Sequence, residues 1–74
     1  MFNKERIKGT VKWYNTDKGY GFIVPDDGGK DVFLHVSDLK DAHYDSIDEG
    51  DRVEFERKKG YGDKVKAVNI KILS

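Results

Sequence analysis

The chain has 74 residues, enough for one small domain, and its 14 basic and 14 acidic side chains give a formal net charge of zero. It contains no cysteine, which excludes a disulfide framework and a thiolate metal site. Without either reinforcement, a hydrophobic core is the expected source of stability, and no stretch approaches the ~20 apolar residues of a membrane span.

Three strands are predicted in the first half of the chain. Residues 7–14 are rich in β-branched and aromatic types, and residues 19–24 and 31–36 are short runs of the same kind. Between the last two stands Pro-Asp-Asp-Gly-Gly, residues 25–29, a composition typical of a turn. The second and third strands are therefore expected to form a hairpin.

The second half predicts two more strands after a long acidic connection. One short helical turn is expected at residues 37–40, where the connection begins. Residues 52–57 alternate strictly between charged and apolar types, and a hairpin loop at 60–63 leads to the last strand, 65–72. Five strands in so short a chain predict a single all-β domain, residues 1–74, folded as a partly open barrel that limits exposed edges.

The predicted core is almost entirely aliphatic. A domain of this size buries only about 60% of the surface of its unfolded chain, so its stability depends on few residues. On the fourth strand, alternation directs Val53 and Phe55 inward and their charged neighbours outward. The expected core residues are Ile7, Val11, Ile23, Val32, Leu34, Leu39, Ile47, Val53, Phe55, Val65, Val68, Ile70 and Ile72.

The predicted hairpin separates aromatic from aliphatic side chains. Because alternate residues share a face of a strand, Tyr20 and Phe22 point the same way, as do Phe33 and His35. The residues between them are aliphatic and suit the core. Four rings side by side on the surface predict a platform for the bases of single-stranded nucleic acid, each stacked base contributing roughly 1–3 kcal/mol.

Other residues of the first strand and its turn extend this prediction. Trp13 and Tyr14 are candidates to enlarge the platform, and Lys8, Lys12 and Lys18 are expected beside the rings, where they meet phosphates. The net charge is +3 over residues 1–25, −8 over 26–56 and +5 over 57–74. A basic surface forms if the two ends of the chain come together, whereas a solvated surface of mixed charge is the plainer interpretation.

The residues bear on three alternative functions: an enzyme, a metal-binding protein and a protein-interaction module. An enzyme is disfavoured, because there is no cysteine nucleophile and no GxxxxGK phosphate loop, and Ser37 near His35 does not make a triad. A metal site would use His35 and His43 with neighbouring aspartates, but their spacing fits no strong motif and no metal or cofactor is expected. The alternative that stays open is a protein–protein interaction module that uses the exposed aromatic face, although the interleaved lysines favour nucleic acid.

Two ordered motifs resemble a known family. Lys-Gly-Tyr-Gly-Phe-Ile, residues 18–23, is similar to the first ribonucleoprotein motif of cold-shock domains, and Val-Phe-Leu-His-Val, residues 32–36, is similar to the second. Val-Lys-Trp-Tyr-Asn, residues 11–15, resembles the opening strand of the same family. With further matches near the C-terminus, the resemblance covers roughly residues 7–72.

The resemblance implies a five-stranded antiparallel barrel of the OB type. Members of the family bind single-stranded RNA and DNA with low sequence specificity, and many act as RNA chaperones in cold or stress adaptation and in the regulation of transcription and translation. The expected protein is a monomer with no small-molecule substrate and no membrane partner. The family's binding positions correspond to Lys12, Trp13, Lys18, Tyr20, Phe22, Asp31, Phe33 and His35, with Tyr44 as an aromatic residue of the long loop.

The sequence departs from the family's pattern at several positions. Tyr14 and Tyr20 stand where phenylalanine is usual, and Val36 stands where many bacterial members carry phenylalanine, which is expected to remove one ring. The last loop, residues 60–64, lacks the usual Gly-Pro pair, and Tyr61 is a candidate for a substitute ring.

The first residues contain no apolar run of the signal-peptide type, which predicts a cytoplasmic location.

Overall fold

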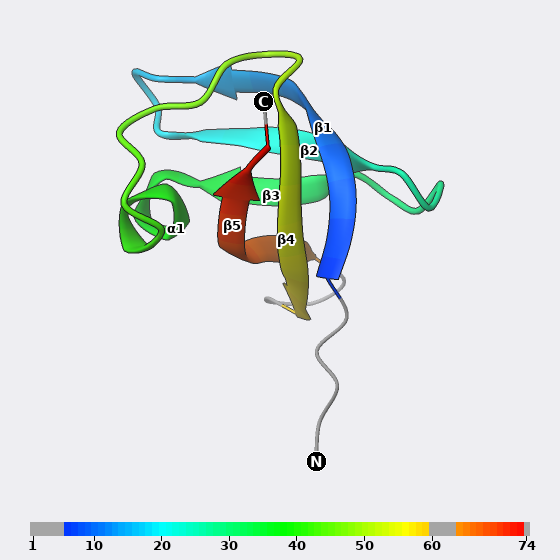
Figure 1. Cartoon of the computed structure of the whole chain (residues 1–74). Coiled ribbons are helices and arrows are strands. Elements are labelled where there is room, and N and C mark those ends of the chain that lie inside the picture. The colour runs from blue at the N-terminus through cyan, green and yellow to red at the C-terminus, as the bar shows by residue number, and fades with distance from the viewer. Residues whose placement is uncertain (1–5, 60–63, 74) are drawn as a thin grey trace.

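Five strands and one short helix form the part of the chain that the computed structural model describes, residues 6–59 and 64–73 (Figure 1). The predicted loop at 60–63, with Tyr61, lies outside the described residues. The elements are β1 (Arg6–Asn15), β2 (Tyr20–Pro25), β3 (Val32–His35), α1 (Val36–Asp41), β4 (Arg52–Lys59) and β5 (Val65–Ile72).

The strands close into a barrel in the order β1-β2-β3-β5-β4, with β4 paired to β1 (Figure 1). The predicted all-β, five-stranded barrel of the OB type is confirmed, as is the hairpin of β2 and β3. The barrel is closed rather than partly open. One pairing, β3 with β5, is parallel, because a closed ring with an odd number of strands cannot alternate in direction all the way around. The other four pairings are antiparallel, as predicted.

The core is close to the prediction on β1 to β4 and differs on β5. Most of the expected residues are buried, and Phe55, Ile23 and Leu34 are fully enclosed. Val65, Val68 and Ile72 are only half-buried, and Ala67 is buried with Ile70 instead. The buried residues are Ile7, Val11, Ile23, Val32, Leu34, Leu39, Ile47, Val53, Phe55, Ala67 and Ile70.

The difference on β5 comes from an irregularity in its pairing with β4. Glu54 pairs with Lys71 and Glu56 pairs with Val68. Phe55 on β4 therefore lies opposite two residues of β5, Asn69 and Ile70. Such a β-bulge breaks strict alternation. Its residue Asn69 has a φ of 51°, the left-handed conformation that asparagine tolerates better than most residues. Counted from the buried Ala67, strict alternation would place Ile70 on the outer face. The bulge brings Ile70 back into the core.

A bidentate ion pair ties the start of β4 to the turn between β2 and β3. The two terminal nitrogens of Arg52 donate to the carboxylate oxygens of Asp26 at 2.9 and 2.6 Å, and one also donates to Thr10 Oγ1 at 2.8 Å. These hydrogen bonds from Arg52 hold the pKa of Asp26 below its usual value. Arg6 lowers the pKa of Glu54 in the same way, by hydrogen bonding and by its charge.

These carboxylates predict a loss of stability in acid. Because the pKa of Asp26 is lower in the folded than in the unfolded chain, its contribution is fully present above the unfolded value and is lost as the pH falls through the folded value. We expect the melting temperature to fall below about pH 4. Thermal melts of the wild type and of Asp26→Asn from pH 7 to pH 2.5 test this, and the variant should show a smaller fall. Equal falls in the two proteins would show that this pair does not contribute.

Candidate nucleic-acid interface

A continuous cluster of rings covers the outer side of β1, β2 and β3. We call it the ring face, and it consists of Trp13, Tyr20, Phe22, Phe33 and His35. Trp13 lies edge-on to Tyr20 and Phe22, with ring centroids 5.6 and 5.3 Å apart. The Phe33 centroid lies 5.8 Å from that of Tyr20, 5.7 Å from Phe22 and 6.0 Å from His35. All five rings are partly accessible, and Trp13 is 37% exposed.

Trp13 belongs to the ring face because β1 contains a bulge. Val11 pairs with Ile23 and Trp13 pairs with Phe22, so Lys12 is an extra residue without a partner on β2. Strict alternation would have placed Trp13 on the same side as the buried Val11. The bulge turns both Lys12 and Trp13 toward solvent.

The two strands approach each other closely beside this bulge. A Cβ added at Gly21 on β2 would run into the carbonyl oxygen of Trp13 and would lie 2.8 Å from the Cα of Tyr14. Both are backbone atoms, which cannot move aside without separating the strands. Only glycine therefore allows the pairing that places Tyr20 and Phe22 beside Trp13.

His35 is held in place by the start of α1. Its Nδ1 accepts a hydrogen bond from the backbone N–H of Ser37 at 3.1 Å and lies 2.9 Å from Ser37 Oγ. The imidazole thus serves as the N-cap of the helix. This contact fixes the plane of the ring beside Phe33 and leaves its Nε2 edge free of the cap.

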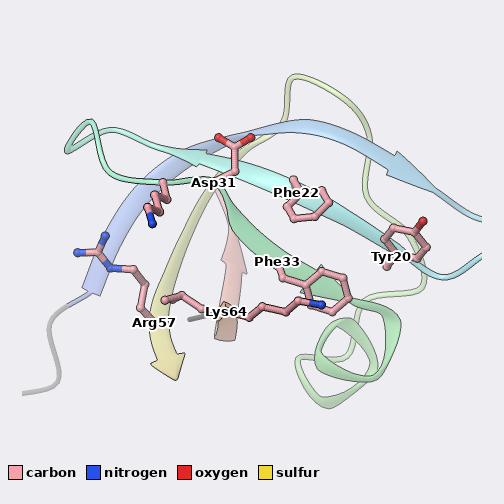
Figure 2. Close-up of a pocket in the computed structure, with 8 residues that line it drawn as sticks. Tyr20, Phe22, Asp31, Phe33, Arg57 and Lys64 are labelled. Carbon is pink, nitrogen blue, oxygen red and sulfur yellow. The ribbon is translucent and has the colours of Figure 1, made fainter. Parts of the chain in front are cut away.

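A groove of about 770 Å³ runs along the ring face and ends in a basic region. Figure 2 shows Tyr20, Phe22 and Phe33 along one part of the groove, with Arg57 at the end away from Tyr20. Lys30 and Lys64 also line it. This arrangement suits a chain of flat apolar groups joined by negative charges, because rings contact the former and cations the latter.

The carboxylate of Asp31 also lines the groove, beside one of the predicted lysines. Lys12 Nζ lies 3.2 Å from its Oδ2, and both side chains are largely exposed. The pair offers one donor and one acceptor at the edge of the rings, which suits the hydrogen-bonding edges of bases. The structure therefore places Asp31 in the groove and Lys12 beside it.

Three predicted residues are not brought to the ring face. Lys8 lies opposite Glu54 on the neighbouring strand β4, and its charge acts on that carboxylate. Lys18 is exposed in the turn before Tyr20, where its backbone N–H donates to Asn15, and no ring contact of its side chain is seen. Tyr44 packs against the core instead of the rings.

The reason for the placement of Tyr44 is its hydroxyl group, which accepts a hydrogen bond from the backbone N–H of Ile72 at 3.1 Å. That bond ties the long loop to the end of β5. Tyr14, a candidate for the platform, also packs against the core, and burial raises the pKa of its hydroxyl. Neither ring extends the ring face.

Lys30 and Arg57 line the groove although the sequence did not single them out, and Val65, which was expected in the core, lines it as well. The positive charge of residues 57–74 is the signal that pointed to this region. Val36, where the resemblance implied a missing ring, begins α1, and its backbone N–H donates to the carbonyl of Gly19 at 2.8 Å. Its side chain packs beside that glycine rather than in the ring cluster.

Comparison with known proteins decides the family. A model of the 'Cold-shock' DNA-binding domain matches residues 7–73, nearly all of the chain. The chain belongs to the cold-shock domain family. The predicted resemblance is confirmed, and the two ribonucleoprotein motifs lie on β2 and β3, where they supply four of the five rings.

Relatives in bacteria, plants and animals share parts of this domain. Cold shock-like protein CspE of Escherichia coli K12 is 55% identical over 51 residues, which cover 69% of this chain and 74% of that protein. Glycine-rich protein 2 of Nicotiana sylvestris is 48% identical over 66 residues, or 89% of this chain and 31% of its own length. The solved structure of drosophila Unr CSD456 matches with a TM-score of 0.77 at 26% identity, over 97% of this chain and 28% of the other. The chain thus spans about a third of the plant protein and of the Unr structure.

Membership of the cold-shock domain family, together with the ring face, implies a protein that binds single-stranded nucleic acid and is not an enzyme. Within residues 6–59 and 64–73, no three histidine or acidic side chains gather as a metal site would require. The same residues include no helix long and apolar enough to cross a membrane.

Proposed function

We propose that this cold-shock domain protein binds single-stranded RNA and DNA with low sequence specificity and acts as an RNA chaperone in cold or stress adaptation. A ligand that binds only the unpaired form of an RNA stabilises that form by mass action, so binding alone is enough to open hairpins. The effect on transcription and translation follows from keeping transcripts unfolded. We also propose that the protein is a monomer and that it is located in the cytoplasm.

The ring face is the observation that carries this proposal. Its five rings contact one another and are all partly exposed, so several successive bases can stack without reading their identity. The residues proposed to contact the strand are Lys12, Trp13, Tyr20, Phe22, Asp31, Phe33 and His35. The positions of Lys8, Lys18 and Tyr44, also expected from the sequence, do not support a contact with the strand.

Strand selectivity tests the proposal. Stacking requires bases that are free of a duplex, so a single strand should bind at least tenfold more tightly than the same strand annealed to its complement. Trp13 is the only tryptophan and belongs to the ring face, so its fluorescence should be quenched on binding. Titration with both oligonucleotides measures the two affinities. Equal affinities would contradict stacking, and an unchanged Trp13 signal would favour a protein-interaction module.

Crosslinking in cells, with sequencing of the bound nucleic acid, shows whether RNA or DNA is the ligand that the protein binds in the cell.

Salt dependence is expected to be modest. Each phosphate contact of a single strand adds about −0.7 to the slope of log K against log salt, and we expect about two to four contacts, hence a slope of about −1.4 to −2.8. The physical reason is that stacking supplies much of the affinity. Fluorescence titrations at four salt concentrations give the slope. A value steeper than about −5 would mean that electrostatics dominates and that the rings contribute little.

A further inference from the structure

The turn between β2 and β3 carries three aspartates, and each forms an ion pair with a cation from another strand. Asp26 contacts Arg52 at 2.6 Å, Asp27 contacts Arg57 at 2.8 Å, and Asp31 contacts Lys12 at 3.2 Å. Two of the cations come from β4 and one from β1. The acidic turn thus neutralises basic side chains on strands that border the ring face.

Arg57 differs from Arg52 in its position relative to the groove. Arg57 lines the groove together with Lys30 and Lys64, whereas Arg52 and Asp26 are not part of its lining. Figure 2 shows Arg57 at the end of the groove away from Tyr20, whereas the side chain of Lys64 extends toward the ring of Phe33. All three cations line the same groove, and the guanidinium of Arg57 can bind a phosphate through two hydrogen bonds.

The carboxylate of Asp27 forms an ion pair with the guanidinium of Arg57 in this structure. The ion pair is about one-third exposed on the arginine side and 43% exposed on the aspartate side, so solvent and ligands can reach both groups. The other oxygen of Asp27 accepts the backbone N–H of Gly29 at 2.9 Å, which fixes the carboxylate within the turn. A fixed carboxylate held against an arginine imitates the anionic oxygen of a phosphate.

We propose that Arg57, in the groove that Lys30 and Lys64 also line, binds a backbone phosphate of the bound strand, and that Asp27 competes with this phosphate for Arg57. The inference rests on the proposed function, since it extends the path of the single strand past Phe33. Asp27 weakens the contact without closing the groove. Its effect is to limit affinity at this end of the strand, which favours rapid release.

The competition has a consequence for salt dependence. When the phosphate replaces Asp27 on Arg57, the freed carboxylate takes up a cation from solution, so the exchange releases almost no net counterion. Without the carboxylate, the same phosphate contact releases a counterion in the ordinary way and adds about −0.7 to the slope. Removing Asp27 should therefore raise affinity and steepen the salt dependence together.

The neighbouring aspartates offer a matched pair of variants. Asp27→Asn and Asp26→Asn each remove one negative charge at adjacent positions, and each removes the carboxylate partner of an arginine on β4. An asparagine oxygen can still accept the N–H of Gly29, so the first variant keeps the turn. Only Asp27→Asn frees an arginine that lines the groove. A general electrostatic effect would act on both variants alike.

Single-stranded oligothymidine is the probe, titrated against Trp13 fluorescence at several salt concentrations. We expect Asp27→Asn to bind about two- to fivefold more tightly than the wild type at low salt, the range for an exposed ion pair, with a slope steeper by about 0.7. Asp26→Asn should match the wild type in both measurements. In an Arg57→Gln background, Asp27→Asn should no longer change the affinity. Thermal melts confirm that each variant is folded at the titration temperature.

Equal effects of the two aspartate variants, or a gain that persists without Arg57, would overturn the phosphate subsite. Either result leaves the proposed function intact, because the wild type would still bind the probe and quench Trp13. Failure of the wild type to bind would instead overturn the proposed function itself.

Discussion

Replacing Phe55 with alanine is expected to unfold most of the protein at room temperature. Its side chain is fully buried on β4, and its ring is packed so closely that a Cβ added at Gly9 would lie 3.2 Å from it. Truncating a buried phenylalanine costs about 3–5 kcal/mol of unfolding free energy. A 74-residue domain has roughly 4–11 kcal/mol in total, and one without disulfides lies near the lower end.

Thermal and urea melts followed by circular dichroism measure this effect. At roughly 4–8 °C for each kcal/mol, the melting temperature should fall by about 12–40 °C. Leu73→Ala is the control, because Leu73 is a large apolar side chain that is 41% exposed and leaves no enclosed cavity. A fall of less than about 5 °C for Phe55→Ala would contradict its place in the core.

The barrel was predictable because its strands carry regular alternation and clear turns. Residues 19–24 and 31–36 alternate in type, and the turn between them contains proline and two glycines, so pairing and faces followed directly. The aromatic face of the hairpin was predictable for the same reason. Periodicity identifies which side chains share a face when no residue is inserted between them.

Prediction failed where the backbone leaves strict alternation. The irregularity at Asn69 shifts the pattern on β5, so Ala67 is buried while the predicted core residues Val65, Val68 and Ile72 are only half-buried. On β1, alternation alone would place Trp13 inward, and the bulge at Lys12 brings this platform candidate to the ring face. No residue type in a single sequence marks a bulge reliably, since its cause is the twist and closure of the barrel. Periodic reasoning therefore gives the wrong face beyond such a position.

The remaining differences come from contacts between distant parts of the chain. Tyr44 lies in an acidic loop without a period, and its hydrogen bond to Ile72 joins residues 28 positions apart. Arg57 was one of several cations near the C-terminus, and only the closure of the barrel brings it to the turn at Asp27. Charge counts indicated a basic region there but did not identify which cation faces the groove.

The ring face predicts that binding and stability can be separated by substitution. Phe22→Ala and Phe33→Ala are each expected to weaken single-strand binding about 5- to 150-fold, which corresponds to roughly 1–3 kcal/mol for one stacked base. Phe33 should have the larger effect, because its ring contacts three others and its loss disturbs Tyr20 and His35 as well. Both rings are partly exposed, so neither substitution leaves a fully enclosed cavity. Stability should therefore fall by less than for Phe55.

Leu34→Ala is the matched control, since Leu34 is the neighbour of Phe33 on β3 and faces the core with no exposed surface. This variant should lose about 2–5 kcal/mol of stability, while its folded fraction binds oligothymidine with nearly unchanged affinity. Thermal melts and oligonucleotide titrations of Trp13 fluorescence on the three variants separate the two effects. If Phe22→Ala and Phe33→Ala unfold the domain while their folded fraction binds normally, the rings serve the core and the stacking surface is wrongly assigned. If Leu34→Ala weakens binding as much as they do, binding depends on the barrel as a whole rather than on the exposed rings.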